Sequence, residues 1–566
     1  MTVLSFLASI GLASGDGDNS ISSIGLGVLL VGLITVAIIV RRLLQHPLPP
    51  GPPALPLLGN ILQLPKREPW RQYDLWKQEY GSIYRLIAGK DTIIVLGNWE
   101  SAHELLNKRS SNYSSRPRCP MAFDLLYKKM HTLLRPSGHE FATHKRAAAP
   151  LVAPRSARLY IPLQQMESLR AMRYLLEHAA SQEAAVELKV GKKANDVDNY
   201  EAVKRALNRF AASVMFSLAY GFPIDTSNAP VMAAAHVVQH NFVEAMKPGT
   251  WPCDVLPALN YLPDWLAPWK RKASEWFEYE KAHHLRNFRR GQASPSWNWT
   301  KELLAGKNAH QFSELELAYD MGILTDAGLD TTGQTIEMFV MIAVTHPLQV
   351  LRAQAELDGV VGRGRLPAHS DKEKLPYTCA LIEEVTRWRP LAIAGVPHSN
   401  VREDMYNGYR IPRGSVIIPN VWSLHGDAAV YGDPELFRPE RWLEKPQLPN
   451  ASFGFGRRAC VGEAIARQSL FIAISHLLWT FRFDKALDEN NCVFEVDTMN
   501  LTDFFVVRPK PFPFRLSPRF SEVSDILQQT WSEMDTDVAS LLTKIGSEYE
   551  RTNGSSWAAE KSNGAI

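Results

Sequence analysis

The stretch Phe453-Gly-Phe-Gly-Arg-Arg-Ala-Cys460-Val-Gly462 decides how this chain is interpreted. Its cysteine lies between glycines, two residues after Arg458, and shortly before an apolar segment expected to be helical, Leu470 to Phe481. Glycine lets a backbone approach a bound group closely, and amides near a helix N-terminus stabilise a negatively charged sulfur. The stretch therefore predicts that Cys460 is a thiolate metal ligand, with Arg458 as a cation for a nearby anion. The alternative is a small buried hydrophobe, which is how we interpret Cys119, Cys253, Cys379 and Cys492.

The composition excludes several classes of protein. The chain has 566 residues, of which 45% are hydrophobic and 21% charged, as in a globular protein with a large core. Lysine plus arginine number 62 and aspartate plus glutamate 59, and the resulting net charge of +3 gives no support for nucleic-acid binding. Five scattered cysteines fit neither a disulfide framework nor a zinc ribbon, and they indicate a reducing compartment.

The N-terminal region predicts a membrane anchor. Residues 19–40 carry no charge, and about twenty helical residues span a hydrocarbon core of about 30 Å. Arg41 and Arg42 follow this run, so the positive-inside rule places residues 1–18 in the lumen and everything after Arg42 in the cytosol. We therefore expect a single-pass anchor over residues 19–42. A cleaved signal peptide is the alternative, although the apolar run is longer than the usual 7–15 residues, roughly, of such a segment.

Behind the anchor, residues 43–60 form a proline-rich hinge, which is expected to be a stiff, extended spacer. Alternation predicts a hairpin over Ser82 to Leu96, and Arg410 to Val421 and Met499 to Arg508 also look β-like. Helical periodicity dominates from Glu100 to Trp388. The expected fold is mainly α with small β-sheets, in one catalytic domain over residues 61–518. Residues 519–566 are interpreted as a polar C-terminal tail, with one helix from Val523 to Ile545.

The loop around Cys460 resembles the haem-binding loop of the cytochrome P-450 family, Phe-x-x-Gly-x-Arg-x-Cys-x-Gly, and every specified position is filled. The resemblance implies the cytochrome P-450 fold and haem b (heme) with Cys460 as the axial ligand of the iron. It also implies cofactor contacts from Phe453, Gly456, Arg458 and Gly462. It covers roughly Pro47 to Pro518, with three further motifs in the family's order.

Two of these motifs imply a structural network. Glu384-Val-Thr-Arg387 resembles the family's Glu-x-x-Arg helix, in which the two charged residues share one helix face. Phe437 to Trp442 resembles the family's Pro-Glu-Arg-Phe segment, with Trp442 in place of phenylalanine. By this resemblance Glu384, Arg387 and Arg441 form a buried network behind the haem, because buried charges need partners. A solvated surface pair is the alternative for the first motif alone.

The third motif lies on a long apolar helix expected over Leu315 to Val344. Ala327-Gly328-Leu329-Asp330-Thr331-Thr332 resembles the family's oxygen-activation motif. A glycine inside a helix costs about 1 kcal/mol relative to alanine, and the resemblance implies that Gly328, with Ala327, leaves space for dioxygen above the iron. Thr331 would hydrogen-bond the oxygen, and Asp330 would relay protons from solvent. An ordinary break in a helix is the alternative.

The resemblance also implies basic partners for the haem propionates. His398, after Pro397, and Arg458 are two candidates. A third comes in the family from a Trp-x-x-x-Arg motif, for which the best match here is Phe141-Ala-Thr-His-Lys145. Lys145 can meet a carboxylate but lacks the bidentate fork of arginine. The neighbours His144 and Arg146 are the alternatives at this position.

The expected function is that of a monooxygenase acting on an apolar small molecule in a large apolar pocket. The segments expected to line the pocket are Pro120 to Met130, Phe242 to Met246, Ile323 to Thr331, Ala392 to Val396 and Thr502 to Phe505. The sequence has no dinucleotide or flavin fingerprint, so the electrons of NADPH would arrive through NADPH–cytochrome P-450 reductase, with cytochrome b5 as a second candidate donor. The anchor, the hinge and the Trp251 to Trp269 stretch resemble microsomal enzymes of filamentous fungi that modify terpenoids or polyketides. The expected location is the endoplasmic reticulum membrane.

Two other functions stay open at this point. One is a haem-thiolate isomerase or dehydratase that uses no oxygen, although such relatives typically lose the acid–alcohol pair that Asp330 and Thr331 supply here. The other is a haem-binding sensor without turnover, which only the altered Phe141 and Lys145 favour. Thr331→Ala separates these functions, because only a monooxygenase should then consume NADPH without forming product.

Overall fold

The computed structural model describes residues 27, 30, 32–33, 46–56, 58–65, 67–187, 197–247, 249–487, 492–503 and 506–554. The chain divides into two compact units, Met1–Pro49 with Glu403–Arg413 and Pro50–Arg402 with Gly414–Ile566. The smaller unit holds a hairpin of β4 (Asp404–Tyr406) and β5 (Tyr409–Ile411), and the Arg410 amide donates to the Pro47 carbonyl over 2.9 Å. The larger unit holds every residue that the sequence predicts to be functional.

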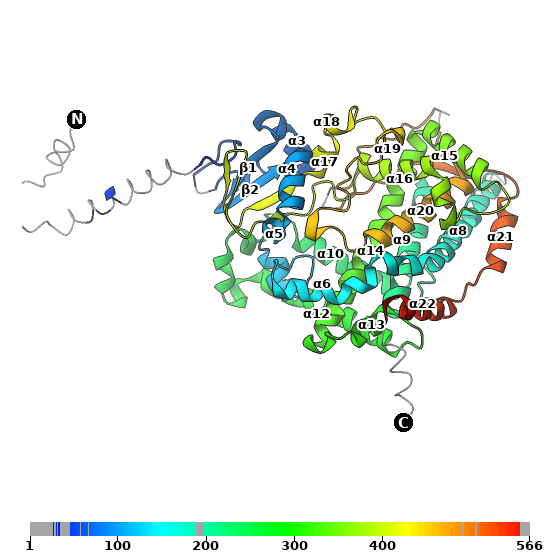
Figure 1. Cartoon of the computed structure of the whole chain (residues 1–566), viewed down its shortest axis with the longest axis horizontal. Helices are drawn as coiled ribbons and strands as arrows, with labels where there is room; N and C mark the ends of the chain where they lie inside the picture. Colours follow the sequence, from blue (N-terminus) through cyan, green and yellow to red (C-terminus); the bar gives the residue numbers. More distant parts are fainter. Residues whose placement is uncertain are drawn as a thin grey trace, which may run out of the picture. The chain divides into compact units, whose positions relative to one another are not determined.

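The larger unit is mainly helical, as expected (Figure 1). Its first helices are α3 (Pro69–Tyr80), α4 (Trp99–Ala102), α5 (Ser110–Tyr113), α6 (His139–Val152), α7 (Pro154–Ala157), α8 (Ile161–Glu187), α9 (Val197–Tyr220), α10 (Pro230–Ala245), α11 (Pro252–Val255), α12 (Pro268–Ala293) and α13 (Trp299–Ala305). They continue with α14 (Glu314–Thr345), α15 (Pro347–Val360), α16 (Pro376–Trp388), α17 (Val421–His425), α18 (Ala428–Tyr431), α19 (Glu440–Glu444), α20 (Glu463–Thr480), α21 (Val523–Glu533) and α22 (Val538–Asn553). Short 3-10 or π helices are η1 (Ile61–Gln63), η2 (His103–Lys108), η3 (Pro120–Leu126), η4 (Arg158–Tyr160), η5 (Pro257–Tyr261), η6 (Asp264–Leu266), η7 (Ala309–Gln311), η8 (His369–Lys374) and η9 (Gly456–Arg458).

Helix α14 is the long helix predicted from the apolar run, and it packs against α9, α12 and α20. A capping box starts it: the Ser313 amide donates to Glu316 over 2.9 Å, and the Glu316 amide donates back to the Ser313 hydroxyl over 3.3 Å. Its C-terminal half, residues 336–344, is buried on every side. A helix that is apolar all round belongs in the interior of a domain, and this one forms the centre of the core.

Glycines let neighbouring helices approach α14 closely. A Cβ on Gly328 would lie 2.6 Å from the sulfur of Met215 on α9, and a Cβ on Gly322 would lie 2.1 Å from Nδ1 of His284 on α12. Both distances are shorter than any ordinary contact, so the side chains of α9 and α12 occupy the space that a larger residue would need. Gly328 therefore has a packing role of its own; the expectation that it leaves space for dioxygen stays a prediction.

The sheets are small. Strands β1 (Ile83–Ala88) and β2 (Asp91–Leu96) form the predicted hairpin, with Ile83 opposite Leu96. Strand β6 (Val416–Pro419) pairs parallel with β2, and β3 (His398–Ser399) pairs antiparallel with β6. Strands β7 (Phe481–Lys485) and β8 (Phe514–Pro518) form a separate antiparallel pair. For Met499 to Arg508, predicted to be β-like, the described residues 499–503 and 506–508 show an isolated bridge from Leu501 to Pro509 in place of a strand.

The segment after Pro518 packs on the helical core. It holds two helices, α21 and α22, where one was expected, because the Asp537 carboxylate caps α22 by accepting from the amides of Ala539 and Ser540. Tyr549 of α22 packs on the Trp297 ring, with centroids 5.2 Å apart. The segment therefore contributes buried apolar surface to the domain.

Within the described residues, no single helix is long and apolar enough to cross a membrane. Helices α14 and α15 meet the criterion only when joined, and they are bent by 106° at their junction. Most of the predicted anchor, residues 19–42, and all of residues 1–18 lie outside the described residues.

Candidate active site

The loop before α20 presents an exposed Cys460. Gly454 and Gly456 take positive φ angles of 76° and 52°, and the Cys460 amide donates to the Phe453 carbonyl over 2.8 Å. Solvent reaches the Cys460 side chain, which is exposed. Protein atoms nevertheless surround its sulfur, and this partial desolvation raises the pKa of the thiol. The backbone amide of Gly462 works in the opposite direction and lowers that pKa. A thiol held in this way becomes a thiolate when a metal cation binds it.

Packing fixes the position of this loop. The Gly456 amide donates to the side-chain oxygen of Asn107 over 2.7 Å. A Cβ on Gly456 would lie 2.2 Å from the carbonyl oxygen of Leu106, so no other residue fits without moving the backbone. Lys145, predicted as a propionate partner, donates from Nζ to the Arg457 carbonyl over 2.7 Å. Lys145 thus ties α6 to the loop.

Arg458 and Arg116 form a cationic cluster, and the imidazole of His398 lies beside them. Arg458 donates to the carbonyls of Ser114 and Arg135, each over 2.6 Å, and Arg116 donates to the Pro397 carbonyl over 2.6 Å. Burial, and then the charge of Arg116, lower the pKa of Arg458 to about 9.

Burial, followed by the charge of Arg116, also lowers the pKa of His398 to about 3. In the part of the chain that the structure describes, neither Arg116 nor Arg458 forms a salt bridge with a carboxylate. Buried guanidinium groups require an anionic partner. The pair of Arg116 and Arg458 near the Cys460 thiol therefore fits haem. Haem brings a metal cation for the sulfur and two carboxylates for the guanidinium groups.

The alternatives at the Lys145 position do not join this cluster. His144 Nδ1 lies 2.5 Å from Oδ2 of Asp320 on α14, and the Arg146 guanidinium donates to the Ala142 carbonyl of its own helix. Phe141, which replaces the expected tryptophan, lies under the Arg458 guanidinium at 3.5 Å from the ring centroid. A cation–π contact thus takes the place of an indole N–H at this position.

The predicted acid–alcohol pair lies in the middle of α14. The Thr331 hydroxyl donates to the Ala327 carbonyl over 2.7 Å, as expected for a threonine that bonds back within its helix. Ala327 is exposed, and the residues beside it on α14, from Ile323 to Thr331, are a mixture of buried and half-buried side chains. Burial raises the pKa of Asp330, and His236, Arg508 and Lys204 lower it in that order.

The three residues of the predicted structural network lie together. Arg387 donates to both oxygens of Glu384, over 2.7 and 2.8 Å, and Arg441 donates to Oε1 over 3.0 Å. All three side chains are at most 2% exposed. Trp442 donates from its indole to Oε2 over 2.9 Å, a bond that the family's phenylalanine cannot make. The substitution of tryptophan therefore adds a fixed donor to the network.

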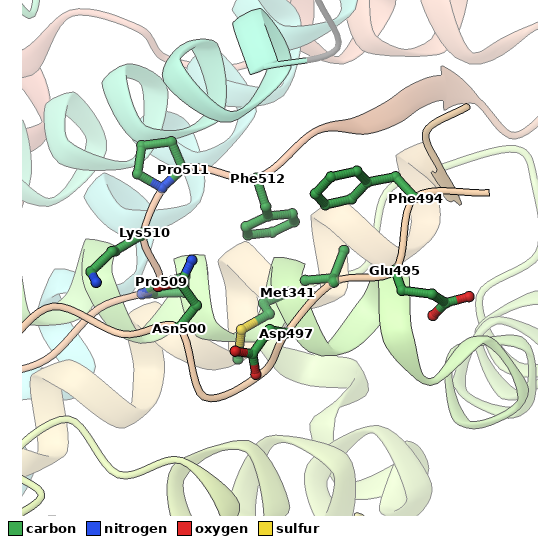
Figure 2. Close-up of a pocket in the computed structure, with 10 residues that line it drawn as sticks. Met341, Phe494, Glu495, Asp497, Asn500, Pro509, Lys510, Pro511 and Phe512 are labelled. Atoms are coloured by element: carbon green, nitrogen blue, oxygen red, sulfur yellow. The ribbon is translucent and has the colours of Figure 1, made fainter. Parts of the chain in front are cut away.

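Three of the five segments expected to line a substrate pocket share one apolar cluster. It contains Met121, Phe123 and Met130, with Phe242 and Ile323 packed against it. Phe504 and Phe505 lie outside the described residues. Figure 2 shows a different, smaller cavity of about 100 Å³ that Met341, Phe494 and Phe512 help to line. None of the predicted catalytic residues lines it, since Met341 lies ten residues, about 15 Å along the helix, beyond Thr331.

Sequence reasoning missed two groups of residues. Arg116 has no distinguishing pattern beyond a lone arginine before Pro117, so it could not be told from a solvated charge. The other group is an interior set of Glu280, His284 and Asp326 between α12 and α14. Among the described residues, neither Glu280 carboxyl oxygen has a hydrogen-bond partner, and His284 Nε2 lies 3.9 Å from Asp326 Oδ2. Burial raises the pKa values of both Glu280 and Asp326.

Comparisons with known proteins agree with this geometry. A sequence model of the cytochrome P-450 family matches residues 49–514. Cytochrome P-450 monooxygenase aneD of Aspergillus aculeatus is 38% identical over 518 residues, which cover 91% of this chain and 96% of that protein. Cytochrome P-450 monooxygenase FrzL of a Cladobotryum species is 34% identical and covers 90% and 94%. The echilunin cytochrome P-450 monooxygenase of Aspergillus ruber is 35% identical and covers 78% and 79%. This chain therefore belongs to the cytochrome P-450 monooxygenase family, whose members hold haem through a cysteine thiolate.

Proposed function

We propose that this protein is a membrane-anchored monooxygenase that inserts one oxygen atom from O2 into an apolar small molecule of secondary metabolism. The observation that carries the proposal is the intact Asp330–Thr331 pair on α14 of a chain that also has the family's cysteine loop. Terpenoids and polyketides are the first substrate classes to test. An isomerase or a sensor has no use for a proton-delivering pair, and we assign neither function.

Cys460 would hold the haem iron through its sulfur in this proposal. Arg116, His398 and Arg458, which have no anionic partner among the described residues, would hold the two haem carboxylates. The loop residues Phe453, Gly456 and Gly462 bring the backbone close to the cofactor, and Lys145 holds the loop through the Arg457 carbonyl. When bound, haem with a thiolate ligand supplies the activation of dioxygen.

The residues of α14 supply protons and space in this proposal. Thr331 donates its hydroxyl to the carbonyl of the exposed Ala327. Asp330, next to Thr331, is the acid that replaces the protons consumed when dioxygen is reduced. The exposed Ala327 is the residue of this turn beside which dioxygen and the substrate carbon would lie, while Gly328 lets α9 approach α14 closely.

Electrons come from NADPH through NADPH–cytochrome P-450 reductase, or from cytochrome b5, in this proposal. The exposed Arg457 and Arg146 and the partly exposed Lys145 flank the cysteine loop and form a basic rim that an acidic partner can dock on. Arg467 pairs with Glu383 and Glu463, so it contributes less free charge to this rim.

The anchor over residues 19–42 places the enzyme on the endoplasmic reticulum membrane with the catalytic domain in the cytosol. The segment between α10 and α12 supports a location at a membrane surface, because its large apolar side chains are exposed. Tyr261 is 92% exposed and Trp265 is 74% exposed, and Leu256 and Leu266 lie nearby in sequence. Aromatic side chains of this kind are typical of a membrane–water interface.

The test is a reconstitution of the full-length protein with NADPH–cytochrome P-450 reductase and a panel of terpenoid and polyketide precursors under 18O2. The proposal predicts a product with one 18O atom, and Thr331→Ala should consume NADPH and form hydrogen peroxide instead. A product formed without oxygen and without NADPH would establish an isomerase and contradict the proposal.

A further inference from the structure

We propose that His236, an exposed histidine on α10, passes solvent protons to Asp330. His236 is thus a positioning and proton-transfer residue that acts through the catalytic acid. The proposal rests on the monooxygenase function above and deepens it by naming the route along which protons reach the buried acid. The observation behind it is that His236 Nε2 lies 3.8 Å from Asp330 Oδ1.

The exposure of the two side chains gives this contact a direction. His236 is 45% exposed and Asp330 is 18% exposed, so the histidine lies on the solvent side of the carboxyl. Asp330 Oδ1 is buried and has no hydrogen-bond partner among the residues that the structure describes. The separation of 3.8 Å is longer than a hydrogen bond, and one water molecule or a small rotation of the exposed imidazole closes it.

A second contact fixes α10 against this part of α14. The Gln239 side chain donates from Nε2 to the Asp326 carbonyl over 3.1 Å. His236 and Gln239 are three residues apart on α10, and Asp326 and Asp330 are four residues apart on α14, so each pair shares one helix face. The Gln239 bond therefore holds His236 beside Asp330 and not beside another turn of α14.

The other charged groups around Asp330 cannot do the same work. Arg508 and Lys204 are the remaining cations that act on it, and Asp326 and the fully buried Glu337 are the acids on its own helix that interact with it. A guanidinium does not release its proton in proteins, and an ordinary ammonium holds its proton at neutral pH. Histidine is the side chain that ordinarily gains and loses a proton near neutral pH. Among the described groups facing Asp330, only His236 combines this chemistry with exposure to solvent.

The transfer changes only N–H and O–H bonds. A proton leaves the His236 imidazolium Nε2 for the Asp330 carboxylate, directly or through one water, and the imidazole regains a proton from solvent at Nδ1. Asp330 then releases its proton toward the hydroxyl of Thr331, its neighbour in the chain. No electron moves in these steps, and no co-reactant other than water is needed.

The first test measures Asp330 directly in the ferric, full-length holoenzyme without substrate. Infrared titration follows the carboxyl band that Asp330→Asn lacks. The proposal predicts that His236→Gln shifts the midpoint of this band to higher pH, because the histidine is the largest influence that lowers the pKa of Asp330. His240→Gln is the matched control, since His240 is also an exposed histidine on α10 and lies one turn further on. Its midpoint should equal that of the wild type.

The second test measures NADPH oxidation by the holoenzyme with its reductase in H2O and D2O, without added substrate. His236→Gln should be about tenfold slower with a larger solvent isotope effect, a smaller loss than the roughly 100- to 10,000-fold typical of a residue that is itself the general acid or base. His236→Lys should stay slow, because lysine keeps the charge but holds its proton.

Wild-type rates and an unshifted midpoint in His236→Gln would overturn the proposal, and so would wild-type rates in His236→Lys. With either of these results, the Asp330→Asn variant would still oxidise NADPH slowly. Failure of the monooxygenase function itself would look different, because the wild type would then oxidise no NADPH.

Discussion

Replacing Glu384 with glutamine tests the buried network behind the cysteine loop. Glu384 accepts five N–H groups over 2.7–3.0 Å, three on Oε1 and two on Oε2, from Arg387, Arg438, Arg441 and Trp442. Glutamine has the same shape but only one acceptor oxygen, so its NH2 group would face at least two donors. It also leaves two buried guanidinium groups without an anion. Removing one partner of a buried ion pair costs about 3–5 kcal/mol.

That loss is large beside the 5–15 kcal/mol, roughly, by which a folded domain is stable. We therefore expect Glu384→Gln to lower the melting temperature of the full-length protein by several degrees and to reduce the fraction that carries haem. The assays are thermal unfolding and the ratio of haem to protein absorbance. Glu383→Gln is the matched control: Glu383 is 29% exposed and pairs with Arg467 near the surface, where such pairs contribute about 0–1 kcal/mol. Equal effects in the two variants would refute the reasoning.

Three other changes probe the loop, the core and the C-terminal helices. Gly456→Ala should lower the ratio of haem to protein absorbance, because its Cβ would lie 2.2 Å from the Leu106 carbonyl oxygen in a residue with φ of 52°. Glu337→Gln should flatten the pH dependence of thermal unfolding between pH 5 and 8. Burial raises the pKa of Glu337 from 4.5 to about 7, so the folded protein binds this proton more tightly than the unfolded chain. The wild type should thus lose up to about 3 kcal/mol of stability as pH rises through this interval. Gly546→Leu should expose α22 to limited proteolysis, because its Cβ would lie 2.7 Å from the Cβ of Trp297.

Local patterns were enough to predict several elements of the fold. The alternation over Ser82 to Leu96 predicted the β1–β2 hairpin, since neighbouring strands with a short turn need no distant partner. The apolar run from Leu315 to Val344 lies within α14, and only the capping residue Ser313 was needed to define its start. The parallel pairing of β2 with β6 joins Ile93 to Val416, and no local pattern encodes so distant a partner.

The candidate site was only partly predictable for the same reason. The family resemblance supplied Cys460, because a ten-residue motif is contiguous in sequence. Arg116 joins the cationic cluster through carbonyls at Leu133 and Pro397, which no spacing in the chain reveals. The contact between His236 and Asp330 likewise depends on how α10 crosses α14. Side chains that meet only after helices pack are invisible to pattern reasoning.

The resemblance predicted a propionate partner at Lys145, and the structure gives Lys145 a different bond. Its ammonium binds the Arg457 carbonyl, while Arg458 stacks on Phe141. Whether Lys145 also reaches a carboxylate is a separate prediction. Phe141 stands where the family has tryptophan, so this position offers an aromatic face instead of an N–H donor. A motif comparison records that change only as a mismatch.

The most direct test of the account is the difference spectrum of the reduced, carbon-monoxide-bound protein in membranes, for the wild type and for Cys460→Ser. A thiolate ligand shifts the main haem band strongly to the red, because it donates electron density to the iron. The account predicts this red-shifted band in the wild type and its loss in Cys460→Ser. A folded, haem-loaded wild type without the band, or a Cys460→Ser variant that keeps it, would contradict the assignment of Cys460.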